Sequence, residues 1–414
     1  MGRTASQPQL SVLVPAWNAA LTIERTLTSI LDEQAVTLEC IVIDDGSTDG
    51  TADLVARAAA HDPRIVLIRR MSNGGVSAAR NDGQAVARGD WLMFVDADDR
   101  LLPGAIPAMV RPMADPTVRA VIGQRIWTDG ERSWVTAAYD IPDIREAGRK
   151  SIATHPGLLY YAALTGKAFH RSLVGDLTFQ GRVLGDQPWT IRALLRARDD
   201  IVVIPETVYE WTRPAPGSKV QTITTGKRVS ALRATEAVAV AIGAYQQIAA
   251  EAVSALPDPE VRRRVMHAYF ERLVRSDFGG PVRDTVSRRD PATDQLYRAL
   301  GRFLEVIPPA SLASSEALRE KILQPPLHHW GTLDEAAREA YWEMLRAAQG
   351  AGQKASPAQV SPRRLARLAL RLAARTNGPT RARLVWLPLA ILGIAGRIKS
   401  VLRRQFLRQT PPPG

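Results

Sequence analysis

The strongest constraint on the fold is an apolar segment that ends in a cluster of carboxylates. Residues 91–95 (Trp-Leu-Met-Phe-Val) are uninterruptedly apolar, and Asp96, Asp98 and Asp99 follow directly. Such a run predicts a strand covered on both faces, with acidic side chains at its C-terminal end. Ligands bind at that end of open α/β sheets, and carboxylates two positions apart can share a divalent cation with a diphosphate. The alternative is a solvated acidic turn before the next helix.

Four short apolar segments alternate with amphipathic segments in the first 120 residues. Their periodicities predict strands at 10–14, 38–43, 65–68 and 91–95 and helices at 21–31, 51–60, 76–87 and 105–113. This alternation is typical of an α/β domain with a Rossmann-like, mostly parallel sheet. Turns rich in small and acidic residues follow the strands, and because parallel strands end at one edge, we expect these turns to meet there.

The rest of the chain divides into a mixed segment, a helical segment and a tail. In the mixed segment we expect antiparallel strands at 120–127 and 133–138, helices at 158–163 and 186–195, and two strands within 201–211 separated at Pro205. Long helical patterns follow at 229–256, 257–276, 293–306, 312–323 and 333–348. The expected organisation is an α/β domain at 1–225, an all-α domain at 226–350, a linker at 351–362 and a basic amphipathic tail at 363–414.

The formal net charge of +12 is concentrated in the tail. Positions 361–414 hold eleven arginines, Lys399 and no acidic residue, which leaves 42 basic and 42 acidic residues before them. The apolar stretch at 384–396 is shorter than the ~20 residues of a membrane span, so we expect a peripheral anchor on an anionic membrane surface. Alternatives are a homo-oligomerisation element or a dock for a polyanionic acceptor, whereas the scarcity of aromatic residues argues against nucleic acid.

The single cysteine and the N-terminal residues indicate in which cellular compartment the chain is expected. Cys40 is the single cysteine and lies in an apolar run, so no disulfide can form within the chain and a buried thiol is expected. Residues 1–10 lack an apolar core of signal-peptide length. We therefore expect a cytoplasmic protein, peripheral to the inner face of the cell membrane.

Common nucleotide and metal motifs do not fit the acidic turns. No Gly-x-Gly-x-x-Gly follows the first strand, no P-loop is complete, and the turn at 44–50 lacks the glutamate of a calcium loop. A sheet edge with Asp45, Arg80, Asp96 and Asp98 remains. These side chains can bond a uracil imide or ribose, pair with a base or phosphate, and hold a metal against a diphosphate. The alternatives are a helix cap for Asp45 and a solvated helix face for Arg80.

Four segments together resemble the family 2 glycosyltransferases, which are inverting enzymes with the GT-A fold. The segments, in the family's order and spacing, are SVLVPAWN at 11–18, IDDGSTDGT at 43–51, NGGVSAARN at 73–81 and FVDADD at 94–99. The resemblance covers about the first 215 residues and implies a nucleotide-sugar donor, most often UDP-linked, with Mn²⁺ or Mg²⁺ on Asp98. The donor-binding residues that it implies are Pro15, Asn18, Asp45, Asn73, Arg80, Asp96 and Arg213.

An inverting transfer also needs a general base for the acceptor hydroxyl. In the family this base is usually the aspartate of a Glu-Asp pair that opens a helix, and the resemblance places it at Asp186. Gly185 stands where the family usually has the glutamate. The alternative is that Asp186 only caps its helix.

The resemblance implies a hexosyl- or N-acetylhexosaminyltransferase that builds a bacterial cell-surface glycan or modifies an envelope polymer. Two alternatives remain open: sugar transfer to a polyprenyl phosphate carrier, and a non-catalytic GT-A scaffold that binds membrane or a polyanion. The presence of Asp45, Asp96, Asp98 and Asp186 favours an active enzyme.

Overall fold

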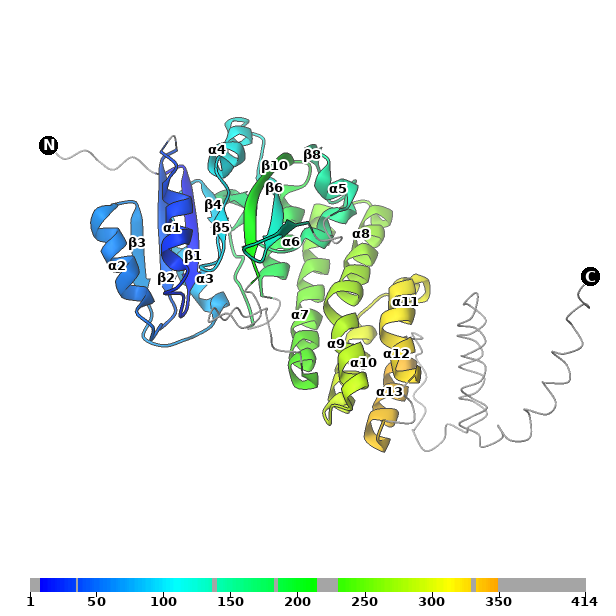
Figure 1. The fold of residues 1–414 in the computed structure, drawn as a ribbon. Coiled ribbons are helices and arrows are strands. Elements are labelled where there is room, and N and C mark those ends of the chain that lie inside the picture. Colours follow the sequence, from blue (N-terminus) through cyan, green and yellow to red (C-terminus); the bar gives the residue numbers. More distant parts are fainter. Residues whose placement is uncertain are drawn as a thin grey trace, which may run out of the picture.

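The computed structural model describes residues 8–34, 36–135, 140–181, 185–213, 230–328 and 333–348. An α/β domain and a helical region pack against each other (Figure 1). The expected linker and basic tail lie outside the described residues, as does the expected domain boundary at residues 225 and 226. Those parts of the domain organisation stay predictions.

One mixed sheet organises the described part of the α/β domain. Its strands are β1 (Leu10–Ala16), β2 (Leu38–Asp44), β3 (Ile65–Arg69), β4 (Trp91–Phe94), β5 (Arg100–Leu101), β6 (Ala120–Thr128), β7 (Ser133–Trp134), β8 (Gly148–Lys150), β9 (Lys167–His170) and β10 (Ile201–Thr212). The strand order is β3-β2-β1-β4-β9-β6-β10-β5, with β7 beside β6 and β8 beside β10. Strands β1 to β4 are parallel to their neighbours among themselves, whereas β9 is antiparallel to both β4 and β6. The predicted α/β class with a mostly parallel sheet is confirmed.

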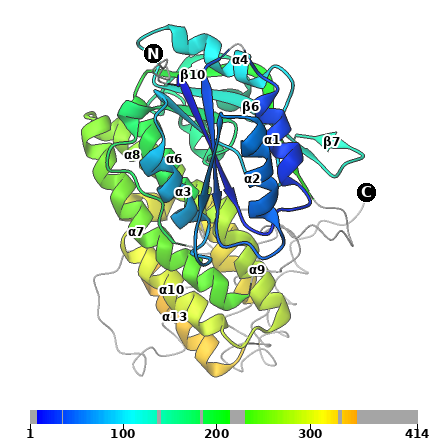
Figure 2. The ribbon, with the colours of Figure 1, turned by 90° about the vertical axis from the view of Figure 1, so that its left-hand side faces the viewer.

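Helices cover both faces of this sheet (Figure 2). They are α1 (Ile23–Leu31), α2 (Thr51–His61) and α4 (Ala105–Val110) on one face, and α3 (Val76–Val86) and α6 (Asp186–Ala197) on the other. Successive residues of β1 serve the two cores, because Val12 packs with the α1 side and Leu13 with the α3 side. The thiol of Cys40 is fully buried, as expected, and burial raises its pKa to about 12.

The second half of the domain differs from the sequence predictions in two places. The predicted separation of 201–211 into two strands is wrong, because β10 is continuous and pairs in parallel with β6. Its register shifts between Val203 and Thr207, so Pro205 occupies an irregular position where a missing N–H costs no ladder bond. The helix expected at 158–163 is a 3-10 helix, Pro156–Tyr161, and a short helix α5 (Pro142–Arg145) precedes it.

The helical region follows the predicted pattern with added short elements. Its helices are α7 (Ala231–Ala255), α8 (Pro259–Arg272), α9 (Gly279–Arg288), α10 (Thr293–Glu305), α11 (Pro309–Ser314), α12 (Gln324–His328) and α13 (Glu335–Ala348), with π-helical segments at Leu273–Phe278 and Leu318–Leu323. Buried side chains of α7, α8 and α10 join the core on the α6 face of the sheet. In the part of the chain that the structure describes, no helix combines the length and apolarity needed to cross a bilayer.

Candidate active site

The turns after β1, β2, β3 and β4 form the C-terminal edge of the parallel strands. Because β1 lies between β2 and β4, and β3 borders β2, the four turns are neighbours at this edge. Pro15 is buried near the end of β1, in register with Ile43 of β2. The convergence expected from the sequence is therefore observed.

Asp45 holds the turn after β3 in place. It is 3% exposed, and its Oδ1 accepts hydrogen bonds from the Gly74 N–H at 2.9 Å and from Nη1 of Arg70 at 3.0 Å. Its Oδ2 accepts from the Gly75 N–H at 2.8 Å. A carboxylate offers about four acceptor positions, so a further donor, such as a base N–H, can still bond to it. The predicted alternative, a helix cap, does not describe these contacts.

Asn18 performs the same task for the turn after β2. The Thr48 N–H donates to Asn18 Oδ1 at 2.9 Å, and the Asn18 N–H donates to Ser47 Oγ at 2.9 Å. The backbone of Asn18 has a φ of 48°, a left-handed conformation that asparagine tolerates better than most residues. Among these turns Gly46 (φ 70°) needs to be glycine, because a Cβ there would lie 2.8 Å from the carbonyl carbon of Ser72.

Arg80 and Asp96 form an ion pair across the edge. Arg80 projects from α3, is 6% exposed, and its Nη2 lies 2.9 Å from Asp96 Oδ1. The guanidinium also lies 5.7 Å from the centre of the Phe179 ring. The predicted solvated helix face for Arg80 is thus wrong. The pair leaves the second oxygen of the partly exposed Asp96 carboxylate available to a ligand.

The three carboxylates after β4 have different environments. Asp99 is fully buried and accepts hydrogen bonds from the Tyr209 hydroxyl at 2.7 Å and the Thr212 N–H at 2.8 Å. Burial, together with the charges of Asp98 and Asp96, raises the pKa of Asp99 well above its usual range. Burial and the charge of Asp96 raise the pKa of Asp98 to about 6. Crowded negative charge of this kind favours a cation.

Tyr209 connects these carboxylates to β10. Its hydroxyl donates to Asp99 and accepts a hydrogen bond from the Asp96 N–H at 3.1 Å. Arg25 of α1 closes the other side, where its Nη2 donates to the Asp98 carbonyl at 2.8 Å and to Thr212 Oγ1 at 2.9 Å. These contacts could not be predicted from the sequence, because no local motif connects residues 96–99 with Arg25, 73 positions from Asp98, or with Tyr209 and Thr212, 110 and 113 positions from Asp99.

Asp186 is the first residue of α6, as the sequence predicts, and is partly exposed. The preceding Gly185 packs so closely that a Cβ would lie 2.4 Å from Ser77 Oγ and 2.7 Å from the Gln180 carbonyl oxygen. This packing leaves no room for the glutamate that the family usually carries at this position. Of the Glu-Asp pair that the family usually carries, only the aspartate is present here, as Asp186.

Two buried cations lie near Asp186. Arg125 of β6 and Lys167 of β9 are 3% and 0% exposed, and both cationic groups lie over the Tyr161 ring, at 4.5 Å and 3.3 Å from its centre. Burial lowers the pKa of each, while the charge of Asp186 acts in the opposite direction. The charge of Asp99 also raises the pKa of Arg125, so carboxylates on both sides of the site act on this guanidinium.

Two predicted donor residues have few constraints in the structure. Asn73 is exposed in the turn after β3. Arg213 is exposed at the end of β10, where its N–H donates to the Thr128 carbonyl at 2.7 Å. The residues after Arg213, up to 229, lie outside the described residues. The structure thus brings together Pro15, Asn18, Asp45, Arg80, Asp96 and Asp98 at one edge, and the roles of all the predicted donor residues stay predictions.

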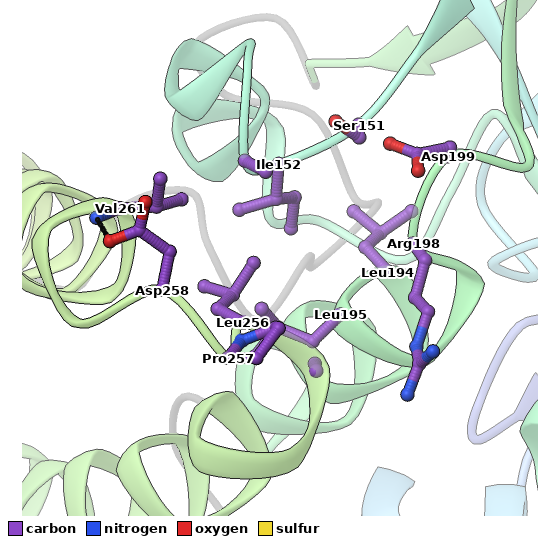
Figure 3. Close-up of a pocket in the computed structure, with 12 residues that line it drawn as sticks. Ser151, Ile152, Leu194, Leu195, Arg198, Asp199, Leu256, Pro257, Asp258 and Val261 are labelled. Carbon is purple, nitrogen blue, oxygen red and sulfur yellow. Dashed lines mark hydrogen bonds between the residues drawn. The ribbon is translucent and has the colours of Figure 1, made fainter.

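A pocket of about 310 Å³ lies away from this edge (Figure 3). Its wall includes Ile152, Leu195 and Leu256, with Arg198 just beyond the C-terminal end of α6. Asp186 lies at the opposite end of this 12-residue helix, roughly 17 Å away at 1.5 Å per residue. The pocket is therefore separate from the acidic edge. Within the described residues, no group of three or more His, Cys, Asp or Glu side chains has the geometry of a metal site.

Comparison with known proteins identifies the domain. The model of the glycosyl transferase family 2 matches residues 11–177. The chain carries a family 2 glycosyltransferase domain. Over 129 residues it is 36% identical to an uncharacterized protein of Mycobacterium tuberculosis, and over 103 residues 42% identical to the succinoglycan biosynthesis protein ExoO of Rhizobium meliloti. These matches cover 31% and 25% of this chain, and only 40% and 29% of the two relatives.

The family 2 glycosyltransferase domain and the helical region together resemble a solved structure. Residues 1–349 of S. aureus TarS, crystallised with UDP-GlcNAc, superpose with a TM-score of 0.63 at 19% identity, over 81% of this chain and 90% of that chain. A likeness at this identity concerns the fold. The expected GT-A fold with a helical C-terminal region is confirmed.

Proposed function

We propose that the protein is an inverting glycosyltransferase that moves a hexosyl or N-acetylhexosaminyl group from a UDP-linked donor to a hydroxyl of a cell-surface glycan or envelope polymer. The observation that carries this proposal is the convergence of Asp45, the Arg80–Asp96 pair and Asp98 at one sheet edge. The names of two relatives, ExoO and the putative teichuronic acid biosynthesis glycosyltransferase TuaG of Bacillus subtilis, support the acceptor class.

The donor would bind along the strand-end turns. Pro15 and Asp45 would contact the uracil, the free oxygen of Asp96 would bond to the ribose, and Asn18 and Asn73 would shape the turns around them. The ion pair with Arg80 would hold the Asp96 carboxylate in a fixed orientation. Arg213 would approach the diphosphate from the end of β10.

The residues at this edge fit a divalent cation. Asp98 and its neighbours present crowded carboxylate oxygens, the ligand type that Mn²⁺ and Mg²⁺ prefer. A metal bound to Asp98 would stabilise the negative charge of the leaving diphosphate. A cation there would also offset the burial and the charge of Asp96 that raise the pKa of Asp98.

Asp186 would act as the base in a single displacement. Its carboxylate takes the proton of the acceptor hydroxyl while the acceptor oxygen bonds to the anomeric carbon. The bond between that carbon and the diphosphate oxygen breaks, and its electron pair leaves with the nucleoside diphosphate.

Thermal unfolding with a panel of nucleotide sugars tests the proposal. UDP-glucose, UDP-galactose, UDP-GlcNAc and UDP-GalNAc are compared at saturating concentration, with and without Mn²⁺, and UDP release is measured for each. One sugar should raise the Tm strongly in the presence of Mn²⁺, because a ligand at 100 times its Kd stabilises the folded state by about 2.7 kcal/mol. Absence of both stabilisation and UDP release would favour a non-catalytic scaffold.

The tail at 363–414, which lies outside the described residues, would attach the enzyme to an anionic membrane surface at the inner face of the cell membrane. The support is its charge, since twelve basic residues and no acidic residue lie between 361 and 414. Flotation with vesicles of phosphatidylglycerol, comparing the full chain with a chain ending at residue 360, measures this attachment. Equal flotation of the two chains would contradict it.

A further inference from the structure

The helical region contacts the first turn of α6, next to the proposed base. Gln187, which follows Asp186, accepts a hydrogen bond through Oε1 from Nη1 of Arg272 at the end of α8. The same Nη1 lies 2.8 Å from Oδ2 of Asp277, and Gln187 Nε2 donates to Asp277 Oδ1 at 3.3 Å. The three side chains therefore form a closed set of contacts between the two parts of the molecule.

This set of contacts is almost completely shielded from solvent. The side chains of Arg272 and Asp277 are 6% and 10% exposed. Burial raises the pKa of Asp277, the charge of Arg272 lowers it, and the charge of Asp186 raises it further. Asp186 is thus close enough for its charge to act on Asp277. A buried ion pair is costly to break but is weak evidence for stability. A role of the Arg272–Asp277 pair in fixing local geometry is therefore a better explanation than a gain in stability.

The backbone between the two ion-pair residues has an unusual form. Arg272 ends α8, and Asp277 lies in the π-helical segment Leu273–Phe278. Residues five apart in an α-helix point in directions about 140° apart, because each residue turns the helix by about 100°. The i→i+5 pattern of a π-helix brings such residues to one side, and π-helical turns occur frequently at functional sites. The π-helical segment therefore allows both side chains to reach Gln187.

The helical region also holds the other half of α6. Glu251 of α7 accepts hydrogen bonds from Nε of Arg192 at 3.1 Å and from Nε of Arg196 at 3.0 Å. Both arginines lie on α6, about two and three turns after Asp186. The helical region thus fixes α6 at two separate places, and only the contact through Arg272 lies beside the proposed base.

We propose that Arg272, held by Asp277, is a positioning residue that sets the orientation of Asp186 through Gln187. The inference rests on the proposed function, because it assigns the helical region a role in the same transfer. Arg272 contacts neither the donor turns nor Asp98, so its effect should fall on turnover and not on donor binding.

The test compares R272Q with the matched control R275Q. Arg275 lies in the same π-helical segment, is exposed, and pairs with Glu271 instead of α6. We expect R272Q to lower the kcat of UDP release by about 10- to 100-fold, since small displacements of a catalytic group have effects of this size. The Kd of the UDP-sugar should stay within twofold of wild type. R275Q should change neither quantity.

A double-mutant cycle and an exchange measurement complete the test. If Arg272 acts through Gln187, the kcat of R272Q/Q187A should equal that of the more impaired single variant. Amide hydrogen exchange in the peptide covering residues 186–195 should be faster in R272Q than in R275Q, with or without substrate. Wild-type kcat in a folded R272Q, or equal exchange in the two variants, would overturn the inference. A wild-type protein that releases no UDP would refute the proposed function, and the exchange comparison would still decide whether Arg272 holds α6.

Discussion

The two sides of the candidate active site are built in different ways. On the donor side, Asp45, Arg80, Asp96 and Asp98 lie on or beside consecutive strands, where Asp45 bonds backbone N–H groups of the next turn and Arg80 pairs with Asp96. On the side of Asp186, the supporting groups come from β6, β9 and the helical region. The donor side is thus a property of one sheet edge, whereas the base side is assembled from distant parts of the chain.

This difference implies a division of labour that experiments can separate. Changes on the donor side should alter the affinity for nucleotide sugar and metal. Changes on the base side should alter turnover at constant affinity.

Among changes on the donor side, the largest effect is expected from D98N. Removing one charged metal ligand should lower UDP release by about 10³-fold, in the range seen when electrostatic stabilisation of a leaving group is lost. Chelation of divalent metal should have the same effect on the wild type. The measurement is UDP release with added Mn²⁺ and with EDTA. Full activity of D98N in EDTA would contradict a role for a metal ion on the donor side.

R80Q is expected to act on donor binding. The substitution leaves Asp96 without its cationic partner. The side chain of Arg80 is 7% exposed and that of Asp96 is 31% exposed, so the pair is largely shielded from water. We expect the Kd for UDP to rise about tenfold and the free energy of unfolding to fall by about 1–3 kcal/mol. Calorimetric titration with UDP and chemical denaturation measure the two quantities. Weakened turnover at unchanged UDP affinity would contradict the division.

Metal affinity should depend on pH through Asp98. Because its folded pKa is about 6, the carboxylate that binds metal is mostly protonated at pH 5 and ionised at pH 7. The affinity for Mn²⁺ should therefore be about tenfold lower at pH 5 than at pH 7. The raised pKa has the opposite effect on the metal-free fold, because its stabilising contribution is complete below about pH 4 and is lost as the pH rises through about 6. Titration of Mn²⁺ at both pH values, with D98N as the control, measures the first effect.

The smallest effect is expected from Y209F. The substitution removes the hydroxyl that joins Asp99 to the Asp96 N–H but keeps the buried ring. The free energy of unfolding should fall by about 1–2 kcal/mol, with a two- to threefold change in UDP affinity. Denaturation at pH 7 measures the loss. An unchanged stability would show that water replaces the hydroxyl at no cost.

The donor side could be predicted from sequence because its signals are local. A buried apolar run places Asp96 and Asp98 at a strand end, and parallel pairing then brings Asp45 and Asn18 to the same edge. The partners of Asp99 could not be predicted. Tyr209 contacts it from β10, and sequence periodicity does not indicate contacts between residues 110 positions apart. For the same reason the sequence does not predict β9, a four-residue strand that carries Lys167 and pairs with strands distant in the chain.

On the side of Asp186, the sequence predicts only this one residue. Asp186 was found through the resemblance, but the closeness of Gly185 to Ser77 and the contact of Arg272 with Gln187 depend on tertiary packing. In the sequence, Arg272 is one of several arginines on an amphipathic helix. Its burial, which distinguishes it, accompanies the π-helical segment and the contact with Gln187 of α6.

The role of Asp186 is tested most directly by measuring UDP-sugar affinity and UDP release in D186N, with the sugar that stabilises the wild type most. UDP release should fall by about 10²- to 10⁴-fold, the usual contribution of a general base, while the Kd of the UDP-sugar should stay within twofold of wild type. UDP release at the wild-type rate in D186N would contradict the assignment of Asp186 as the base.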